Sequence, residues 1–155
     1  MGTQNKYEVD KAKNRIKLNR VLYSKMTYPA EYGFIDKTLA EDGDPLDILV
    51  LATTKTFPGC VVDARVIGYL DMIDSGEPDQ KIIAVVDADP RFDDIDDINN
   101  IKELQLKEIK LFFSNYKILE PGHHVEVLEY YAKDKAIKLI EDCQKAYTAN
   151  LKSKM

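Results

Sequence analysis

The spacing of apolar residues changes from a strand pattern to a helical pattern near residue 100, and that change limits the possible folds more than any other feature. Up to about residue 88, apolar and β-branched residues alternate or form short runs, as in "RIKL" at 15–18 and "KIIAVVDA" at 81–88. This pattern is typical of β-strands. In "IKELQLKEIKLFFSNYKIL" at 101–119 the apolar residues instead recur at helical spacing, and "EPG" at 120–122 is expected to end the helix. Strands come first and helices late, which predicts an α+β domain.

Turn residues between the apolar runs separate the remaining elements. "KYEV" at 6–9 and "RIKL" flank the turn-like "DKAKN" and predict a β-hairpin. Residues 19–45, rich in Tyr, Pro, Gly and Asp, predict an irregular connection. "LDILVLA" at 46–52 and "CVVDARVIGYLDMID" at 60–74 predict further strands.

The C-terminal part completes the expected fold. "HHVEVLEYY" at 123–131 predicts a last strand, and "KDKAIKLIEDCQKAY" at 133–147 predicts a last amphipathic helix. We expect the strands to form a small, strongly curved sheet or barrel.

Length and composition favour one cytoplasmic domain. With 155 residues the chain can build one core, and we expect a single domain over residues 1–155. The formal charge of −5 disfavours nucleic acid and acidic membranes as partners of the whole chain. No apolar run is long enough for a membrane span or a signal peptide. Cys60 and Cys143 lack metal or redox spacing and are expected to be packed, reduced thiols.

Carboxylates crowd the loop that leads into one of the expected strands. Asp42, Asp44 and Asp47 lie within six residues in "EDGDPLDILVL", where their like charges repel. A second acidic loop, "DMIDSGEPDQK" at 71–81, also lies where a strand meets a turn, so the two loops could converge. Carboxylate oxygens without nearby His or Cys suit Mg²⁺ or Mn²⁺. An EF-hand is excluded, because its glycine position would fall on Asp47.

Simpler structural roles compete with metal binding for several of these groups. Asp and Gly are ordinary turn residues, which explains "EPDQ" taken alone, whereas Asp47 at the start of a buried strand favours a site. The acidic run "DDIDDINNIKE" at 93–103 precedes the long helix, so helix capping is favoured over metal binding there. His123 and His124 have no ligand partners at suitable spacing and are expected to be surface or structural histidines.

Groups that could bind an anion are scattered over the sequence. Lys and Arg are most often solvated, and Tyr is equally suited to half-buried packing, so none of these residues identifies a site by itself. The candidates are Lys6, Arg20, Lys81, Lys117, Tyr28, Tyr32 and Tyr116.

Taken together, these motifs resemble the family I soluble inorganic pyrophosphatases of the bacterial type. "YPAEYGFI" is followed by "TLAEDGDPLDILVL", which contains the Asp-x-Asp-Pro-x-Asp signature of that family. "KYEVD", "NRVLY", "GYLDMIDSGEPDQKIIAV" and "FFSNYK" occur in the family's order and approximate spacing. The resemblance covers about residues 5–147.

The resemblance implies a role for each matching residue. Asp44 corresponds to the general base that orients the attacking water. The implied substrate-binding groups are Lys6, Arg20, Lys81, Tyr32, Tyr116 and Lys117, with Tyr28 bordering the site. The implied metal ligands are Asp42, Asp47 and Asp79 for the tighter Mg²⁺, with Asp47 bridging to a second ion, Asp74 sharing a further ion with Asp79, and Glu8 holding the ion that arrives with the substrate.

The resemblance also implies the activity and the assembly. We expect an antiparallel, OB-like β-barrel with flanking helices, two of them C-terminal. We expect it to hydrolyse diphosphate to two orthophosphates by direct attack of water activated by two metals. Several Mg²⁺ ions per site are implied, with Mn²⁺ or Zn²⁺ as substitutes. A homohexamer is implied as well.

The sequence differs from the family pattern at two places, and two other functions remain as alternatives to diphosphate hydrolysis. Family members usually begin with an additional strand bearing a glutamate, and we expect that strand to be missing here, because "MGTQ" directly precedes "NKYEV". Ser75 stands where many bacterial members carry an acidic residue beside Asp74. The alternatives are a catalytically impaired metal-binding or scaffold protein of the same fold, and a phosphohydrolase acting on nucleotides. Against the latter, the sequence contains no Walker-type loop.

Overall fold

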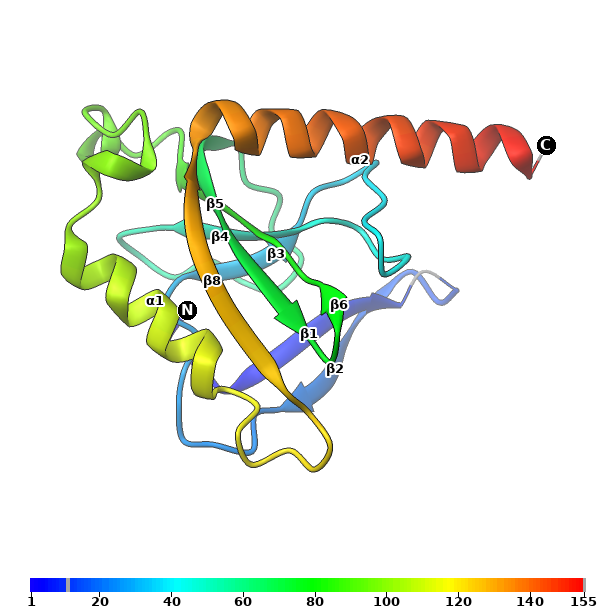
Figure 1. The fold of residues 1–155 in the computed structure, drawn as a ribbon, viewed down its shortest axis with the longest axis horizontal. Coiled ribbons are helices and arrows are strands. Elements are labelled where there is room, and N and C mark those ends of the chain that lie inside the picture. The colour runs from blue at the N-terminus through cyan, green and yellow to red at the C-terminus, as the bar shows by residue number, and fades with distance from the viewer. Residues whose placement is uncertain (11, 155) are drawn as a thin grey trace.

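A computed structural model describes residues 1–10 and 12–154 of the chain (Figure 1). Its elements are β1 (Asn5–Asp10), β2 (Arg15–Val21), β3 (Glu31–Phe34), β4 (Asp47–Leu51), β5 (Ala64–Asp74), β6 (Glu77–Pro78), β7 (Lys81–Val86), the short 3₁₀ helices η1 (Pro90–Phe92) and η2 (Ile98–Asn100), α1 (Glu103–Asn115), β8 (Val125–Ala132) and α2 (Lys133–Ser153).

The larger sheet is built around β7. Strands follow the order β3-β4-β7-β5-β6, and β8 lies off this path and pairs antiparallel with β5. β7 runs parallel to β4, with Asp47 opposite Lys81, and antiparallel to β5. Because β7 is paired on both edges and covered on both faces, its sequence "KIIAVV" is apolar without alternation after its first residue.

The α+β class and the two C-terminal helices are confirmed, but a closed antiparallel barrel is not. Within the described residues, β1 and β2 form a separate two-stranded sheet, and no pairing closes the larger sheet. After β4, the connection 52–63 leads the chain into β5, and the chain then turns back to form β7 between β4 and β5. β7 therefore runs antiparallel to β5 and parallel to β4.

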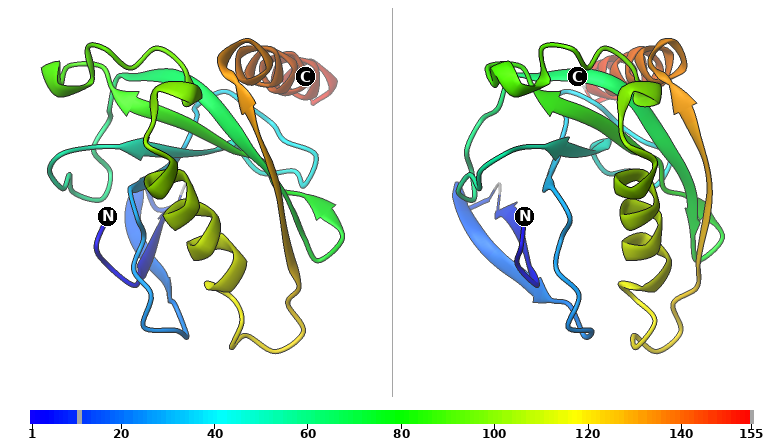
Figure 2. Two further views of the ribbon diagram at one scale, coloured as in Figure 1. Left: turned by 60° about the vertical axis from the view of Figure 1, so that its left-hand side comes forward. Right: turned by 90° about the vertical axis from the view of Figure 1, so that its left-hand side faces the viewer.

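Neighbouring residues of the central strands pack on opposite faces of the sheet. Leu49 and Ile83 belong to the core that contains Phe112 of α1, whereas Ile48 and Ile82 belong to a second core that contains residues of α2. Figure 2 shows α1 and the β1–β2 hairpin on one side of the sheet and α2 across the other. The space between the hairpin, the sheet and the end of α1 is where the candidate site lies.

Element boundaries differ from the sequence prediction at several places; β5, for example, was predicted from residue 60 but begins at Ala64. β3 forms within the stretch 19–45 that was predicted to be irregular, and it pairs with β4, for example through Tyr32 and Leu49. α1 ends at Asn115, before the expected end at 119, and α2 continues past 147 to Ser153. Among the described residues, neither helix combines the length and apolarity needed to cross a bilayer.

The acidic run 93–103 caps helices as predicted, but not the helix that was expected. Asp97 accepts hydrogen bonds from Asn99 N at the start of η2 and from Lys133 N at the start of α2. α1 itself begins after Lys102, which makes no side-chain cap. The run therefore joins η2 to α2, because the chain folds back so that both helix starts meet at one carboxylate.

A close contact at Gly68 fixes the path of β5. The register between β5 and β7 shifts between Val66 and Gly68, which marks an irregularity in the strand. A Cβ atom at Gly68 would lie 2.5 Å from the Tyr131 carbonyl oxygen and 2.9 Å from Ile98 Cβ. Only glycine allows β8 and η2 to approach β5 so closely.

Replacing Gly68 by Ala should lower the free energy of unfolding by about 2 kcal/mol, because backbone and core atoms must shift to admit the methyl group. Urea unfolding followed by circular dichroism measures the change. Gly33→Ala in β3 is the matched control, since its Cβ would meet only Ile48 Cγ2 at 3.9 Å. Equal stability of the two variants would show that the contact at Gly68 relaxes without cost.

Candidate active site

One pocket collects nearly all of the predicted site residues. A cavity of about 210 Å³ lies between the β1–β2 hairpin, the loop before β4, the β5–β7 connection and the C-terminal end of α1. Of the predicted residues, only Glu8 is absent from its lining. The lining residues are Lys6, Arg20, Tyr28, Tyr32, Asp42, Asp44, Asp47, Asp74, Glu77, Pro78, Asp79, Lys81, Tyr116 and Lys117.

A single lysine between two carboxylates organises the inner end of the pocket. Lys81 is 1% exposed, and its Nζ donates to Asp47 Oδ2 at 2.6 Å and to Asp79 Oδ1 at 2.5 Å. Burial disfavours the charged amine, but the two carboxylates outweigh burial and raise the pKa of Lys81. The ammonium group therefore stays charged although it is buried.

One lysine does not compensate two carboxylates fully. Burial is the largest cause that raises the pKa of Asp79, and although Lys81 opposes it, the negative charges of Asp47 and Asp74 add to it. The Tyr32 hydroxyl also donates to Asp47 Oδ2 at 2.5 Å. This end of the pocket carries excess negative charge, which a further cation would relieve.

The turn between β5 and β6 places Asp74 at a second wall. Ser75 and Gly76 have φ values of 54° and 88°, as the two central residues of a tight hairpin turn require. Asp74 forms an ion pair with Lys117 and accepts a hydrogen bond from Ser75 Oγ at 3.0 Å. Burial alone would raise the pKa of Asp74, but Lys117 and Ser75 lower it below its usual value. Ser75, which stands where many members of the family carry an acidic residue, therefore forms part of the turn and donates a hydrogen bond to Asp74.

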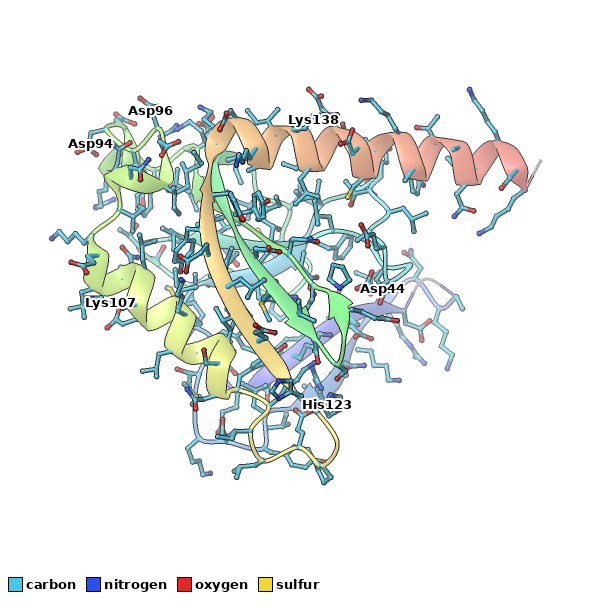
Figure 3. All side chains as sticks on the ribbon, in the orientation of Figure 1. Asp44, Asp94, Asp96, Lys107, His123 and Lys138 are labelled. Carbon is cyan, nitrogen blue, oxygen red and sulfur yellow. The ribbon has the colours of Figure 1, made fainter. Side chains whose placement is uncertain are left out.

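Asp42 and Asp44 stand on a tight loop directly before β4. Asp44 N donates to Asp42 Oδ1 at 3.0 Å, and Ala40 N donates to Asp44 O at 2.8 Å. Gly43 has a φ of 86°, which favours glycine. These bonds leave both carboxylates exposed at the pocket mouth. Figure 3 shows Asp44 beside the β5–β6 end of the sheet, far from Asp94 of the acidic capping run.

The hairpin supplies cationic groups from the opposite side. Lys6 and Arg20 are direct partners in the β1–β2 register, and both line the pocket. Glu8 points to its hairpin neighbours instead: it lies 3.3 Å from Lys6 Nζ and accepts from Asn19 at 2.8 Å. Its metal role stays a prediction.

Three tyrosines add neutral donors to the lining. Tyr28 and Tyr116 are buried, and Tyr32 is packed 5.2 Å from Tyr28 between ring centroids. Burial raises the pKa of Tyr28 to about 12, and it raises the pKa of Tyr32 and of Tyr116 as well. The three hydroxyl groups therefore remain protonated at physiological pH. Those of Tyr28 and Tyr116 can donate to an anion, whereas the hydroxyl of Tyr32 already donates to Asp47.

Two acidic residues near the site were missed by sequence reasoning. Glu77 lines the pocket opposite Asp74 across the turn, within the acidic loop already singled out. Glu120 is 8% exposed and lies behind Arg20, whose Nη1 donates to Glu120 Oε2 at 3.1 Å. No pattern marked Glu120, because it lies in "EPG", which was interpreted only as a helix stop. His123 is exposed, as expected, but it does have carboxylate neighbours in the fold: its ring nitrogens lie 3.6 Å from Glu120 Oε2 and 3.9 Å from Asp74 Oδ1.

The charges of the pocket suit a hard divalent cation. Six carboxylates and four cationic side chains line it, which gives a formal charge of −2. Within residues 1–10 and 12–154, no three His, Cys, Asp or Glu side chains form a ready metal cage. Mg²⁺ does not need one, because it keeps several waters and is usually held by one or two carboxylates. The purely oxygen donor set therefore fits Mg²⁺.

Comparisons with known proteins agree on one family. The family model described as "Inorganic pyrophosphatase" matches residues 1–148. The inorganic pyrophosphatase of Halalkalibacterium halodurans is 55% identical over 146 residues, which is 94% of this chain and 89% of that protein. The crystal structure of inorganic pyrophosphatase from Thermus thermophilus has a TM-score of 0.92 at 46% identity, over 95% of this chain and 86% of that one. The Helicobacter pylori enzyme has a TM-score of 0.92 at 42% identity, over 95% and 88% of the two chains.

Replacing Lys81 by Met should destabilise the metal-free protein by about 3 kcal/mol, because Asp47 and Asp79 then lose their shared buried cation. Urea unfolding in EDTA measures the loss. Lys138→Met on α2 removes a lysine from an exposed ion pair and should change stability by less than about 0.5 kcal/mol. A Lys81→Met protein as stable as this control would show that the two carboxylates need no lysine.

Proposed function

Since this chain belongs to the inorganic pyrophosphatase family and is a hydrolase that converts inorganic diphosphate to two orthophosphates, we propose that Mg²⁺-dependent hydrolysis takes place in the pocket beneath the β1–β2 hairpin. The observation that carries this proposal is the gathering of both signs of charge in one cavity. The carboxylates come from the loop that leads into β4 and from the β5–β7 connection, and Lys, Arg and Tyr side chains make up most of the remaining lining.

A diphosphate anion would be repelled by a pocket with a formal charge of −2. In our proposal Asp42, Asp47, Asp79 and Asp74 hold Mg²⁺, with Glu8 holding an ion that enters with the substrate; Mn²⁺ or Zn²⁺ could substitute. When bound, these ions lower the pKa of a bound water and neutralise phosphoryl charge. The raised pKa of Asp79 supports a cation at that end of the pocket.

Asp44 is proposed to accept a proton from the attacking water. It lies at the pocket mouth on a loop held by hydrogen bonds, and it makes no ion pair within 4.0 Å among the described residues, so its carboxylate is free to act as a base. The lining contains no Ser, Cys or His side chain that could attack phosphorus. This composition supports direct attack of water without a covalent intermediate.

The remaining groups are proposed to hold phosphoryl oxygens and to stabilise charge that develops on them. Lys81 has three N–H donors, of which Asp47 and Asp79 take two, so one remains for the substrate. The other proposed phosphate-binding groups are Lys6, Arg20, Tyr32, Tyr116 and Lys117, with Tyr28 bordering the site.

We also propose that residues 1–155 act as one catalytic domain in a cytoplasmic homohexamer. Exposed apolar side chains on one face of the hairpin support association with other copies: Tyr7, Val9, Ile16 and Leu18. The phosphate-release experiment below distinguishes this function from that of an impaired scaffold protein and from that of a nucleotide phosphohydrolase.

Phosphate release from sodium pyrophosphate should rise as Mg²⁺ is titrated in and should vanish in EDTA, because the pocket requires added cations to accept the anion. ATP in place of diphosphate should give little release. Folded protein that binds Mg²⁺ but releases no phosphate would favour the scaffold alternative. Faster release from ATP than from diphosphate would favour a nucleotide hydrolase.

Replacing Asp44 by Asn should reduce kcat by about 10²–10⁴-fold, because the amide cannot accept the proton of the attacking water. Mg²⁺ affinity, measured by isothermal titration calorimetry, should stay close to that of the wild type. Asp94→Asn, at the far corner of the molecule, is the matched control and should retain full turnover. Normal turnover of Asp44→Asn would remove Asp44 from the role of base.

A further inference from the structure

We propose that Glu120 is a positioning residue for substrate binding: it fixes the Arg20 guanidinium so that its Nε and Nη2 edge is presented to a phosphoryl group. This inference rests on the proposed function, because it assigns a task to a residue behind the diphosphate pocket. Glu120 itself does not line the pocket.

The contact between the two residues joins distant parts of the chain. Arg20 lies near the end of β2, and Glu120 lies in the segment between α1 and β8. Arg20 Nη1 donates to Glu120 Oε2 at 3.1 Å and lies 3.4 Å from Oε1. The Glu120 side chain is 6% exposed and that of Arg20 is 28% exposed, so solvent screens this ion pair only in part.

The other edge of the same guanidinium group makes no hydrogen bond to the part of the chain that the structure describes. Arg20 Nε is buried and makes no hydrogen bond to any described residue. A buried donor without a partner is unusual in a folded protein, and a ligand oxygen that accepts from Nε would satisfy it. Nε and Nη2 lie side by side on a planar group, and their spacing matches two oxygens of a phosphoryl group. Because Glu120 takes Nη1, this edge is left for the anion.

The segment that carries Glu120 also positions Lys117, a second charged residue of the site. Glu120 N donates to Lys117 O at 2.9 Å, so the residue belongs to the turn that follows Lys117. Lys117 itself reaches into the pocket and pairs with Asp74. One turn therefore places a cation in the pocket and, three residues later, an anion behind the arginine of the facing hairpin.

A simple structural ion pair would dock the hairpin without affecting substrate binding, and two measurements separate these roles. The first is the KM and kcat for Mg²⁺-diphosphate. The second is the affinity for inorganic phosphate in the presence of Mg²⁺, by isothermal titration calorimetry, which does not depend on turnover. The variants are Glu120→Ala, Glu120→Gln and Arg20→Gln, together with Glu120→Ala combined with Arg20→Gln.

Glu120→Ala should lower kcat/KM and phosphate affinity by about 10- to 100-fold, because the arginine loses its fixed orientation. Glu120→Gln keeps an oxygen acceptor and should retain most of both. In the Arg20→Gln background, Glu120→Ala should lower kcat/KM and phosphate affinity by no more than about 2-fold, since the arginine that Glu120 orients is already gone. Glu129→Ala, which removes an exposed partner of Lys110, is the control and should change neither quantity.

Equal losses from Glu120→Ala with and without Arg20 would overturn the inference, as would a lower unfolding midpoint with unchanged KM and phosphate affinity. If Glu120→Ala does not fold, Glu120→Asp serves instead, because its shorter carboxylate cannot reach Nη1 in the same geometry. Unchanged kinetics and phosphate affinity in a folded Glu120→Asp protein would overturn the inference as well.

A wild-type protein that binds phosphate but does not hydrolyse diphosphate would refute the proposed function. The phosphate affinities of the variants would still test the role of Glu120.

Discussion

The pocket depends on the buried contact of Lys81 with Asp47 and Asp79. The parallel register of β4 and β7 sets Asp47 directly beside Lys81 at the end of two central strands, and the turn after β6 returns Asp79 to the same amine. The lysine makes it tolerable to bury these carboxylates in part, but burial, with the charges of Asp47 and Asp74 added to it, still raises the pKa of Asp79. The same arrangement that holds the sheet end together therefore favours a further cation beside these carboxylates, which is where we propose that Mg²⁺ binds.

The rest of the site is attached to this centre by long-range polar contacts. Asp74 pairs with Lys117 after α1, and Arg20 on the hairpin pairs with Glu120. Each contact joins segments that lie far apart in the sequence, so the walls of the pocket are set by tertiary structure and not by local geometry. The hairpin and the end of α1 lie on the same side of the sheet, which lets their cationic groups face the carboxylates (Figure 2).

Much of this could be predicted from the sequence, and the failures have physical causes. The period of apolar residues located the hairpin, β4, β5, β7, β8 and both helices, because burial on one or two faces leaves a direct trace in the sequence. β3 was missed because a four-residue strand among Pro, Gly and Tyr leaves too little pattern. The parallel β4–β7 pair depends on where a loop leads the chain, which no local period records. Family motifs named most of the residues that line the pocket but not Glu77, whereas Glu120, known only by its contact with Arg20, carried no signal.

The position of β7 also orders the formation of the enzyme in time. β4 is synthesised before β5, but its neighbour in the sheet is β7, which follows both. Until residues 81–86 leave the ribosome, β4 has an unpaired edge and Asp47 has no counter-ion. The Arg20 contact waits longer still, for residue 120. Such non-local pairing folds slowly and exposes apolar strand edges while it is incomplete. The emerging chain therefore passes through a stage in which the apolar strand β4 lacks its neighbour β7, and in that interval it is exposed to aggregation.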